Sequence, residues 1–399
     1  MAWLLPWGMV LLPWGLVLLA CGLDRLIGDP PAWRHPVQLM GAAITALRGL
    51  AERICGSSPP ALRLAGGLIT LVVVGGSGLV GWGIERLALG LPLLGLPLLL
   101  AGLASGLAGR SLEQAVQAVL AALPGGAAQP SAAASSAGGS YAGGSELEPA
   151  RQRLAWIVGR DVAELDAGEI LRACAETAGE NGVDGLFAPL FWMLVGAALW
   201  SWWLGVETGG RLELSSWPPG SWPLGTWSLG TWSPWSWPPG PLALVWMFKA
   251  ASTLDSMLGY RRGKLRWLGS AGARLDDILT WLPCRLVAFS LPLLAGAGLG
   301  SWGQFRRALR EGAPDPSPNA GVSQAAYGLA AGVRLGGVNR YGGRERAKPL
   351  LAVEYRAADR GGVTAMLALS RRLALAWLLG ALPLMALLQG LGRWAGAGG

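Results

Sequence analysis

The sequence predicts an all-α, polytopic integral membrane protein, a helical bundle of about five to seven membrane segments with large cytoplasmic loops. Of its 399 residues, 52% are hydrophobic and only 14% are charged, whereas a soluble domain carries about 25% charged residues. Several apolar runs approach or exceed the roughly 20 residues that a spanning helix needs. The net charge of +8 fits loops beside anionic lipid or anionic substrates, and no basic stripe with interleaved aromatics indicates nucleic-acid binding.

The N-terminal part contains the first predicted span and an interfacial helix. Residues 3–23 form an apolar run without a basic n-region, which favours a spanning helix over a cleaved signal peptide. A loop at 24–41 leads into apolar residues at helical spacing over 37–54, and this pattern predicts an amphipathic helix at the membrane interface.

Two glycine-rich spans are predicted next, at 65–84 and 87–109, and glycine permits their close packing. A tight turn carrying Glu85 and Arg86 is expected between them. Residues 124–145 are almost entirely Gly, Ala and Ser, which indicates a flexible linker without chemistry. The whole chain is otherwise predicted to form one membrane-integral domain, 1–399.

The longest helix pattern of soluble character covers residues 160–184. Asp166 and Glu169 have the spacing of a capping box. Further along, three carboxylates share a stripe about 80° wide on one helix face. They are Glu176, Glu180 and Asp184. Because like charges at this spacing repel, we interpret the stripe as a site for a cation or a basic ligand.

The C-terminal half adds further membrane segments. Spans are predicted at 186–206 and 373–391, and 278–300 is a further apolar run that two prolines interrupt. The apolar half of 241–277 is short and charged, so that a re-entrant or half-buried helix fits it as well as a span does. Residues 207–240 contain five-residue units with Trp at the second position. We interpret them as a low-complexity insert with indoles at the membrane interface rather than as a binding site.

The positive-inside rule places the basic loops in the cytoplasm and the tryptophan-rich insert outside. The basic loops are 24–63, 110–185, 259–277 and 301–372. The last two share a side only if 278–300 enters the membrane and returns, or if the chain crosses once more. The sequence leaves both alternatives open.

Five polar clusters adjoin apolar segments, where charges are costly enough to indicate function. They are Asp24/Asp29/His35, Glu176/Glu180/Asn181/Asp184, Lys249/Asp255/Tyr260/Arg261/Lys264, Asp276/Asp277 and Asn319/Asn339/Arg340/Tyr341. The acidic set suits Mg²⁺ bridging to phosphates, and the basic set suits a nucleotide or phosphate. Structural roles stay open, because charges also end helices and hold turns. No GxxxxGK[ST] is present, which excludes a P-loop.

Soft-ligand metal chemistry has little support in the sequence. One histidine, His35, cannot alone form a histidine-based metal site. The four cysteines are scattered without a CxxC pair, which favours thiols without a redox role. They are Cys21, Cys55, Cys174 and Cys284.

Four long stretches carry a resemblance to a known family. They are LDRLIGDPPAWRHPVQLMG, RLAWIVGRDVAELDAGEILRACAETAGENGVDGLFAPLFW, FKAASTLDSMLGYRRGKLRWLGSAGARLDDILTWLPCRL and SPNAGVSQAAYGLAAGVRLGGVNRYGG. In this order they resemble the adenosylcobinamide-phosphate synthase family of cobalamin biosynthesis over nearly the whole chain. The sequence departs from the family pattern in its long linker and tryptophan-rich insert, and in single residues at Gly179 and Val322.

The resemblance implies a ligase in the cytoplasmic membrane, with its active site on the cytoplasmic side. It implies that adenosylcobyric acid is joined to (R)-1-amino-2-propanol O-phosphate, or to ethanolamine phosphate, with ATP and Mg²⁺. Contact with other membrane enzymes of the corrin pathway is a further implication. Two other classes stay open: a Mg²⁺-dependent phosphotransferase or prenyltransferase, although no DDxxD motif is present, and a corrinoid transporter, although no internal helix repeat is found.

With this resemblance, the polar clusters receive hypothetical roles. The residues assigned to the metal are Glu176, Glu180, Asp184 and Asp255. Those assigned to catalysis are Asp29, His35, Glu180, Asp184 and Lys249, with Asp29 and His35 as candidates for deprotonating the amine. Those assigned to phosphates, the amino-alcohol phosphate or the corrin amides are Tyr260, Arg261, Lys264, Asn319, Asn339, Arg340 and Tyr341, with Lys249 as a further phosphate ligand.

Overall fold

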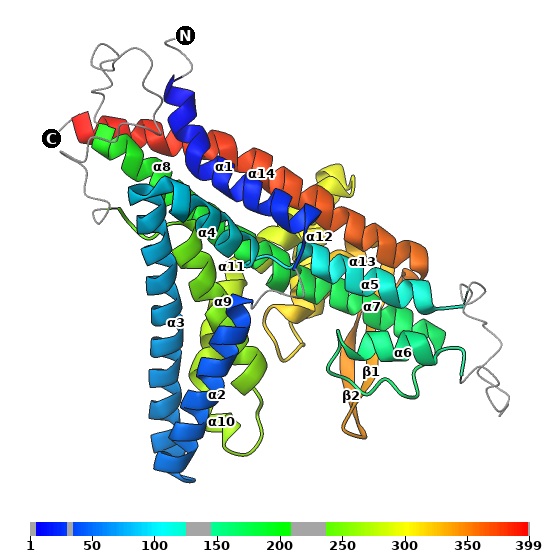
Figure 1. Cartoon of the computed structure of the whole chain (residues 1–399). Coiled ribbons are helices and arrows are strands. Elements are labelled where there is room, and N and C mark those ends of the chain that lie inside the picture. The colour runs from blue at the N-terminus through cyan, green and yellow to red at the C-terminus, as the bar shows by residue number, and fades with distance from the viewer. Residues whose placement is uncertain (1–4, 30–34, 125–144, 209–236, 398–399) are drawn as a thin grey trace, which may run out of the picture. The chain divides into compact units, whose positions relative to one another are not determined.

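The computed structural model describes residues 5–29, 35–124, 145–208 and 237–397, most of them in helices (Figure 1). This confirms the predicted all-α membrane class. Among these residues, four helices are long and apolar enough to cross a membrane, or up to five spans if a bent helix pair counts as one. The four are Pro59–Gly90, Ala167–Val206, Ser270–Leu294 and Arg360–Gly396, and the bent pair is Pro92–Ala104 with Gly109–Ala122.

The chain divides into two compact units by its internal contacts. Unit 1 comprises 1–108, 189–276 and 376–399, and unit 2 comprises 109–188 and 277–375. Most of the predicted linker at 124–145 and of the insert at 207–240 lies outside the described residues. The prediction of a single domain stays a prediction.

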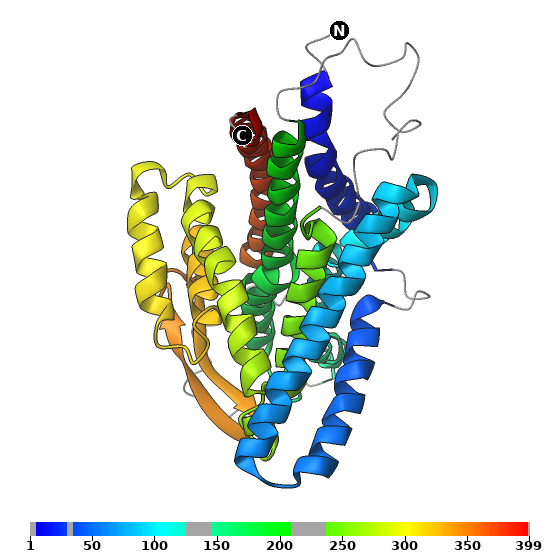
Figure 2. The same ribbon diagram turned by 90° about the vertical axis from the view of Figure 1, so that its left-hand side faces the viewer.

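In unit 1, helix α3 (Pro59–Gly90) packs along α9 (Pro241–Leu258) (Figure 2). Glycine permits this approach, because a Cβ atom on Gly81 would lie 2.9 Å from the Cα of Ala243. The predicted amphipathic helix is confirmed as α2 (Pro36–Cys55), and the predicted first span forms α1 (Leu5–Leu26). Further helices are α4 (Pro92–Ala104), α8 (Ala188–Thr208) and α10 (Leu265–Leu268).

The predicted turn at Glu85 and Arg86 is wrong, because both residues lie inside α3. Glu85 is completely buried. Its carboxylate accepts three backbone hydrogen bonds at the start of α9, where N–H groups have no partner within the helix. The donors are Gly240 (2.9 Å), Leu242 (2.7 Å) and Ala243 (3.1 Å). Glu85, for which the sequence predicts a turn, therefore links α3 to the start of α9.

Unit 2 is built on α7 (Ala167–Gly182), which begins at the predicted capping box. The Asp166 carboxylate accepts from the Glu169 N–H at 2.7 Å, and the Glu169 carboxylate accepts from the Asp166 N–H at 3.1 Å. A π-helical turn, η1 (Val183–Phe187), follows α7. Other helical elements are α5 (Gly109–Ala122), α6 (Glu148–Ala155), α11 (Ser270–Leu294), η4 (Gly298–Gly300), α12 (Ser301–Gly312), α13 (Ala320–Ala331) and α14 (Arg360–Ala397), with α11 and α14 contributing to both units.

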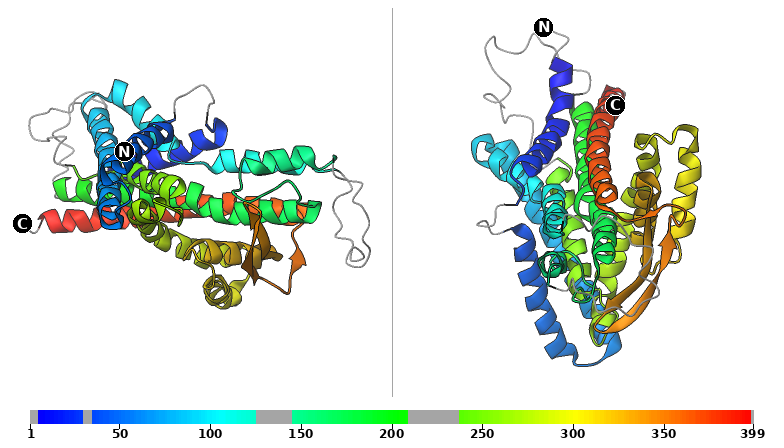
Figure 3. Two further views of the ribbon diagram at one scale, coloured as in Figure 1. Left: turned by 90° about the horizontal axis from the view of Figure 1, so that it is seen from below. Right: turned by 90° about the vertical axis from the view of Figure 1, so that its right-hand side faces the viewer.

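The predicted basic loop at 301–372 is wrong, because these residues form the helices α12 and α13, a three-stranded sheet and the first turns of α14 (Figure 3). Strand β1 (Val333–Tyr341) pairs antiparallel with β2 (Arg344–Leu351), and β3 (Arg356–Ala357) pairs parallel with β1. Gly342 and Gly343 form the turn with positive φ, as two-residue hairpin turns require. Their N–H groups donate to the Asp161 carboxylate at 3.1 and 2.8 Å.

Helices α7 and α13 bring the elements of unit 2 together around the site described next. Gly179 of α7 faces α13, because a Cβ atom at this position would lie 3.4 Å from the Cβ of Tyr327 and 3.5 Å from the Cα of Gln324. The Tyr327 hydroxyl is completely buried and hydrogen-bonded to Ser370 at 2.6 Å. Burial raises the pKa of Tyr327, so the phenol stays neutral and structural.

Candidate functional site

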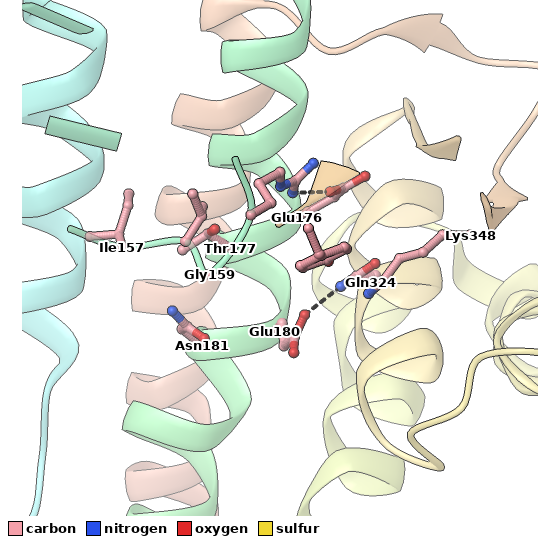
Figure 4. Close-up of a pocket in the computed structure, with 11 residues that line it drawn as sticks. Ile157, Gly159, Glu176, Thr177, Glu180, Asn181, Gln324 and Lys348 are labelled. Atoms are coloured by element: carbon pink, nitrogen blue, oxygen red, sulfur yellow. Dashed lines mark hydrogen bonds and ion pairs between the residues drawn. The ribbon is translucent and has the colours of Figure 1, made fainter. Parts of the chain in front are cut away.

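A polar cavity of about 160 Å³ lies within unit 2 (Figure 4). Its walls come from segment 157–160 ahead of α7, from α7 itself, from α13 and from the β-hairpin. Charged and amide side chains from all four elements line it. They are Arg160, Glu176, Glu180, Asn181, Gln324 and Lys348. The hydroxyl side chains of Thr177 and Tyr341 lie in the same wall.

The carboxylates Glu176 and Glu180 lie in this wall because they are one helical turn apart on α7. This confirms that the sequence spacing places both on one face. Asp184 lies in the π-helical turn after α7, where the regular spacing of about 100° per residue no longer holds, and it is not part of the cavity lining. The predicted stripe of three carboxylates thus contributes two to the cavity.

Glu176 lies at the centre of an arginine cluster. Its Oε2 accepts a hydrogen bond from Arg160, and its Oε1 accepts from Arg172 at 3.3 Å and from the N–H of Gly336 at 3.0 Å. The Oδ1 atom of Asn339 accepts from Arg160 at 2.5 Å and from Arg172 at 3.0 Å. Glu176 is only 2% exposed. Two guanidinium groups and one carboxylate leave this cluster with a surplus positive charge.

Glu180 accepts fewer hydrogen bonds than Glu176. Its Oε2 accepts a hydrogen bond from the amide of Gln324 at 2.6 Å, and Figure 4 shows this amide directed at the carboxylate. Among the residues that the structure describes, no hydrogen bond to its Oε1 is found. Gln324 itself is 2% exposed. One oxygen of the Glu180 carboxylate is therefore left for a ligand.

Lys348 reaches the same cavity from β2. Its ammonium group lies 3.4 Å from the buried carboxylate of Asp315. Burial by itself would lower the pKa of Lys348, but the nearby carboxylates of Glu180 and Asp315 outweigh burial and raise it. Lys348 is therefore charged at neutral pH and offers a cation to an anionic group.

The other predicted site residues of unit 2 hold the surrounding structure. Asn339 fixes the two arginines of the Glu176 cluster, and its buried Nδ2 has no hydrogen-bond partner within the described part of the chain. Asn319 is also buried: its Nδ2 donates to the carbonyl of Asp277 at 2.9 Å, and its Oδ1 accepts from Arg285 at 2.5 Å. Arg340 is on the surface, paired with two exposed glutamates, Glu164 and Glu345.

The remaining predicted residues lie in unit 1, in two places. Lys249 and Asp255 are half-buried on α9, and the loop after this helix exposes Tyr260 and Arg261, with Lys264 half-buried. The guanidinium of Arg262 lies 5.0 Å from the Tyr260 ring. These cations remain candidates for phosphate binding, and their roles stay predictions.

Asp29 and His35 form a pair at the start of α2. The Nε2 atom of His35 lies 3.4 Å from the Asp29 carboxylate, while its Nδ1 accepts from the N–H of Val37 at 3.2 Å as a helix cap. Nδ1 thus caps α2, whereas Nε2 is buried near Asp29 without a hydrogen-bond partner among the described residues. The proposed role in deprotonating an amine stays a prediction.

The donor set offers limited support for the predicted Mg²⁺ site. Among the described residues, no group of three His, Cys, Asp or Glu side chains is placed to hold a metal ion. Both oxygens of Glu176 are already occupied by arginine and backbone donors. The assignment of Mg²⁺ to Glu176, Glu180, Asp184 and Asp255 therefore stays a prediction, and we derive no chemical step through a metal.

Comparisons with known proteins place the chain in a family. A model of the family described as "CobD/Cbib protein" matches residues 17–370, most of the chain. The chain belongs to the CobD/CbiB family. Cobalamin biosynthesis protein CobD of Synechocystis sp. is 38% identical over 330 residues, which cover 82% of this chain and 79% of that protein. No solved structure matches the chain.

Two further CobD/CbiB relatives extend this similarity. Cobalamin biosynthesis protein CobD of Klebsiella pneumoniae is 36% identical over 379 residues, which cover 93% of this chain and 95% of that protein. Cobalamin biosynthesis protein CbiB of Salmonella arizonae is 34% identical over 329 residues, or 82% of this chain and 83% of that protein. The family match includes every residue that lines the cavity of unit 2.

Sequence reasoning missed three residues of this CobD/CbiB site. In the sequence, Arg160 stands only at the start of a helical stretch, and Gln324 and Lys348 lie in the segment whose pattern predicts a basic loop. Gln324 lies 144 positions from its partner Glu180. One signal was available for Lys348: it is one of only three lysines in the chain.

Proposed function

We propose that this CobD/CbiB protein acts in cobalamin biosynthesis as an ATP-dependent amide ligase. It joins adenosylcobyric acid to (R)-1-amino-2-propanol O-phosphate, or to ethanolamine phosphate, and yields adenosylcobinamide phosphate or its ethanolamine analogue. The relatives' names support the pathway. The observation that carries the proposal is the cavity of unit 2, which lies inside the family match and combines a surplus cation with a carboxylate that has a spare oxygen.

The proposed reaction proceeds in two steps because a carboxylate is a poor electrophile. ATP first transfers its γ-phosphoryl group to the propionate oxygen of adenosylcobyric acid, which gives an acyl phosphate and ADP. The amine nitrogen then attacks the acyl carbon, the C–N bond forms, and the bond from carbon to the phosphate oxygen breaks. The ammonium loses two protons overall, one to the departing phosphate and one to the surroundings.

Cationic side chains are needed in both steps, because charge accumulates on phosphoryl oxygens. Arg160 and Lys348 are suited to this in unit 2, and Lys249, Arg261 and Lys264 are the candidates in unit 1. ATP, with Mg²⁺ to neutralise its phosphates, belongs to the proposal, as does a cytoplasmic-membrane location with the site on the cytoplasmic side.

The test is product formation by the purified full chain in detergent. The protein is incubated with adenosylcobyric acid, aminopropanol phosphate, Mg²⁺ and ATP, and mass spectrometry follows the condensed corrinoid and ADP. Product in a one-to-one ratio with ADP, absent when ATP is omitted, supports the ligase. No product with either amino-alcohol phosphate, while adenosylcobyric acid still binds, overturns it in favour of a transporter or a partner-dependent subunit.

A further inference from the structure

The cavity of unit 2 has two electrically opposite ends on one face of α7. At Glu176, two guanidinium groups face one carboxylate: Arg160 lines the cavity, and Arg172 lies behind the lining. No other carboxylate within ion-pair distance of either arginine is found among the described residues. At Glu180, one turn further along, the carboxylate holds a single amide hydrogen bond. The first end therefore favours an anion, and the second favours a cation.

The separation of these ends sets the size of the ligand. Residues one helical turn apart on α7 are separated by about 5–6 Å along the axis. In an amino-alcohol phosphate, two carbons and one oxygen separate the nitrogen from the phosphorus, and this spacer covers a comparable distance. A cavity of about 160 Å³ is also small beside the roughly 300–1,000 Å³ that larger ligands occupy.

The charges of the lining disfavour a polyphosphate in the same place. A triphosphate that extended along α7 would bring its oxygens against the Glu180 carboxylate. A zwitterion instead places its ammonium there, where a carboxylate oxygen and the carbonyl oxygen of Gln324 can both accept.

We propose that this cavity is the receptor for the amino-alcohol phosphate, with the ammonium group at Glu180 and the phosphate at Arg160 and Lys348. The inference rests on the proposed function for the identity of the ligand. It assigns Glu180 to recognition of the amine, and Gln324 to positioning the Glu180 carboxylate through its 2.6 Å hydrogen bond.

The test measures binding without turnover, with the purified full chain in detergent and no ATP or corrinoid. Calorimetry compares (R)-1-amino-2-propanol O-phosphate with isopropyl phosphate, which lacks the amine. The wild type prefers the amine-bearing probe by about tenfold or more, as expected for a charged hydrogen bond. Glu180→Gln reduces this preference to about threefold or less, because it keeps the acceptor for Gln324 but loses the charge.

Two controls separate recognition from folding. Lys348→Met weakens both probes by a similar factor, on the order of tenfold, and keeps the preference for the amine. Glu148→Gln changes an exposed glutamate of the same unit and leaves both affinities at the wild-type value. Because the readout is a ratio of two affinities, a general loss of folded protein does not imitate the expected result.

Equal binding of the two probes by the wild type overturns the inference, as does a Glu180→Gln variant that keeps the amine preference. Glu180-dependent binding of Mg²⁺ alone, without amine preference, overturns it in favour of a metal site. The ligase assay is run in parallel. Product formation with an intact preference in Glu180→Gln removes only this inference, whereas selective binding without any product removes only the proposed ligase.

Discussion

Glu85 in unit 1 and Glu180 in unit 2 both lie in long helices, yet their carboxylates are bound in opposite ways. Glu85 is completely buried, and its two oxygens accept three backbone hydrogen bonds from the start of α9. Glu180 lines a cavity and accepts one hydrogen bond, from Gln324. The difference shows that burial of a charge alone does not mark a ligand site.

Glu176 lies between these two cases. It lines the same cavity as Glu180, but both of its oxygens are occupied by Arg160, Arg172 and the N–H of Gly336. By the comparison above it resembles Glu85 more than Glu180. Replacing each glutamate in turn by glutamine, which keeps the shape and removes the charge, therefore separates structural from ligand-binding carboxylates.

Glu85→Gln is expected to have the largest effect on stability. The variant keeps one oxygen but turns an NH₂ group toward backbone N–H donors of α9, so buried donors lose their partners. At about 1–3 kcal/mol for each unsatisfied group, the loss is about 3 kcal/mol or more. Apparent melting temperatures in detergent measure it, with the exposed Glu148→Gln as the matched control. If Glu85→Gln melted at the same temperature as the Glu148→Gln control, the Glu85 carboxylate would not be needed for stability.

Glu176→Gln is expected to destabilise unit 2 by about 3 kcal/mol, because it breaks a buried ion pair and leaves two guanidinium groups without an anion. The side chains of Arg160 and Glu176 are 6% and 3% exposed, so solvent screening does little to soften the loss. The same melting experiment measures it. An unchanged melting temperature together with lost ligand binding would instead assign Glu176 to the ligand.

Glu180→Gln is expected to act on turnover rather than on stability. The hydrogen bond from Gln324 survives, so the melting temperature stays at the wild-type value. Amide formation falls by about a hundredfold or more, equivalent to about 2.7 kcal/mol in the barrier. Initial rates from the mass-spectrometric assay measure the fall. Substantial retained activity in a folded variant would remove Glu180 from the site.

Local sequence patterns were sufficient for the parts of this molecule that depend on neighbouring residues. The capping box at Asp166 and Glu169, the amphipathic helix α2 and the shared face of Glu176 and Glu180 all follow from spacing along one helix. Each involves residues no more than a few turns apart, so that helical periodicity decides the outcome.

The parts that the sequence missed depend on distant partners. The sequence predicts a turn at Glu85, because this charged residue lies between two apolar runs. The donors that bind its carboxylate are about 155 positions away and leave no local signal. Gln324 and Lys348 reach the cavity from α13 and from a β-hairpin within a segment whose charge and glycine content resembled a loop. The π-helical turn at Val183–Phe187 likewise interrupts the regular spacing that was assumed for Asp184.

The smallest effect is expected for a fourth glutamate, Glu354, which is exposed and paired with Arg307. The hydrogen bond from Arg307 lowers the pKa of Glu354 below its ordinary value of 4.5. The pair therefore stabilises the fold above pH 4.5, and this contribution is lost as the pH falls through the lowered pKa. Glu354→Gln thus melts slightly below the wild type at pH 7, and the difference disappears in acid and in high salt. If the difference in melting temperature between variant and wild type instead grew on acidification, the ion pair would oppose folding. The predicted decrease in effect from buried to exposed glutamates would then be wrong.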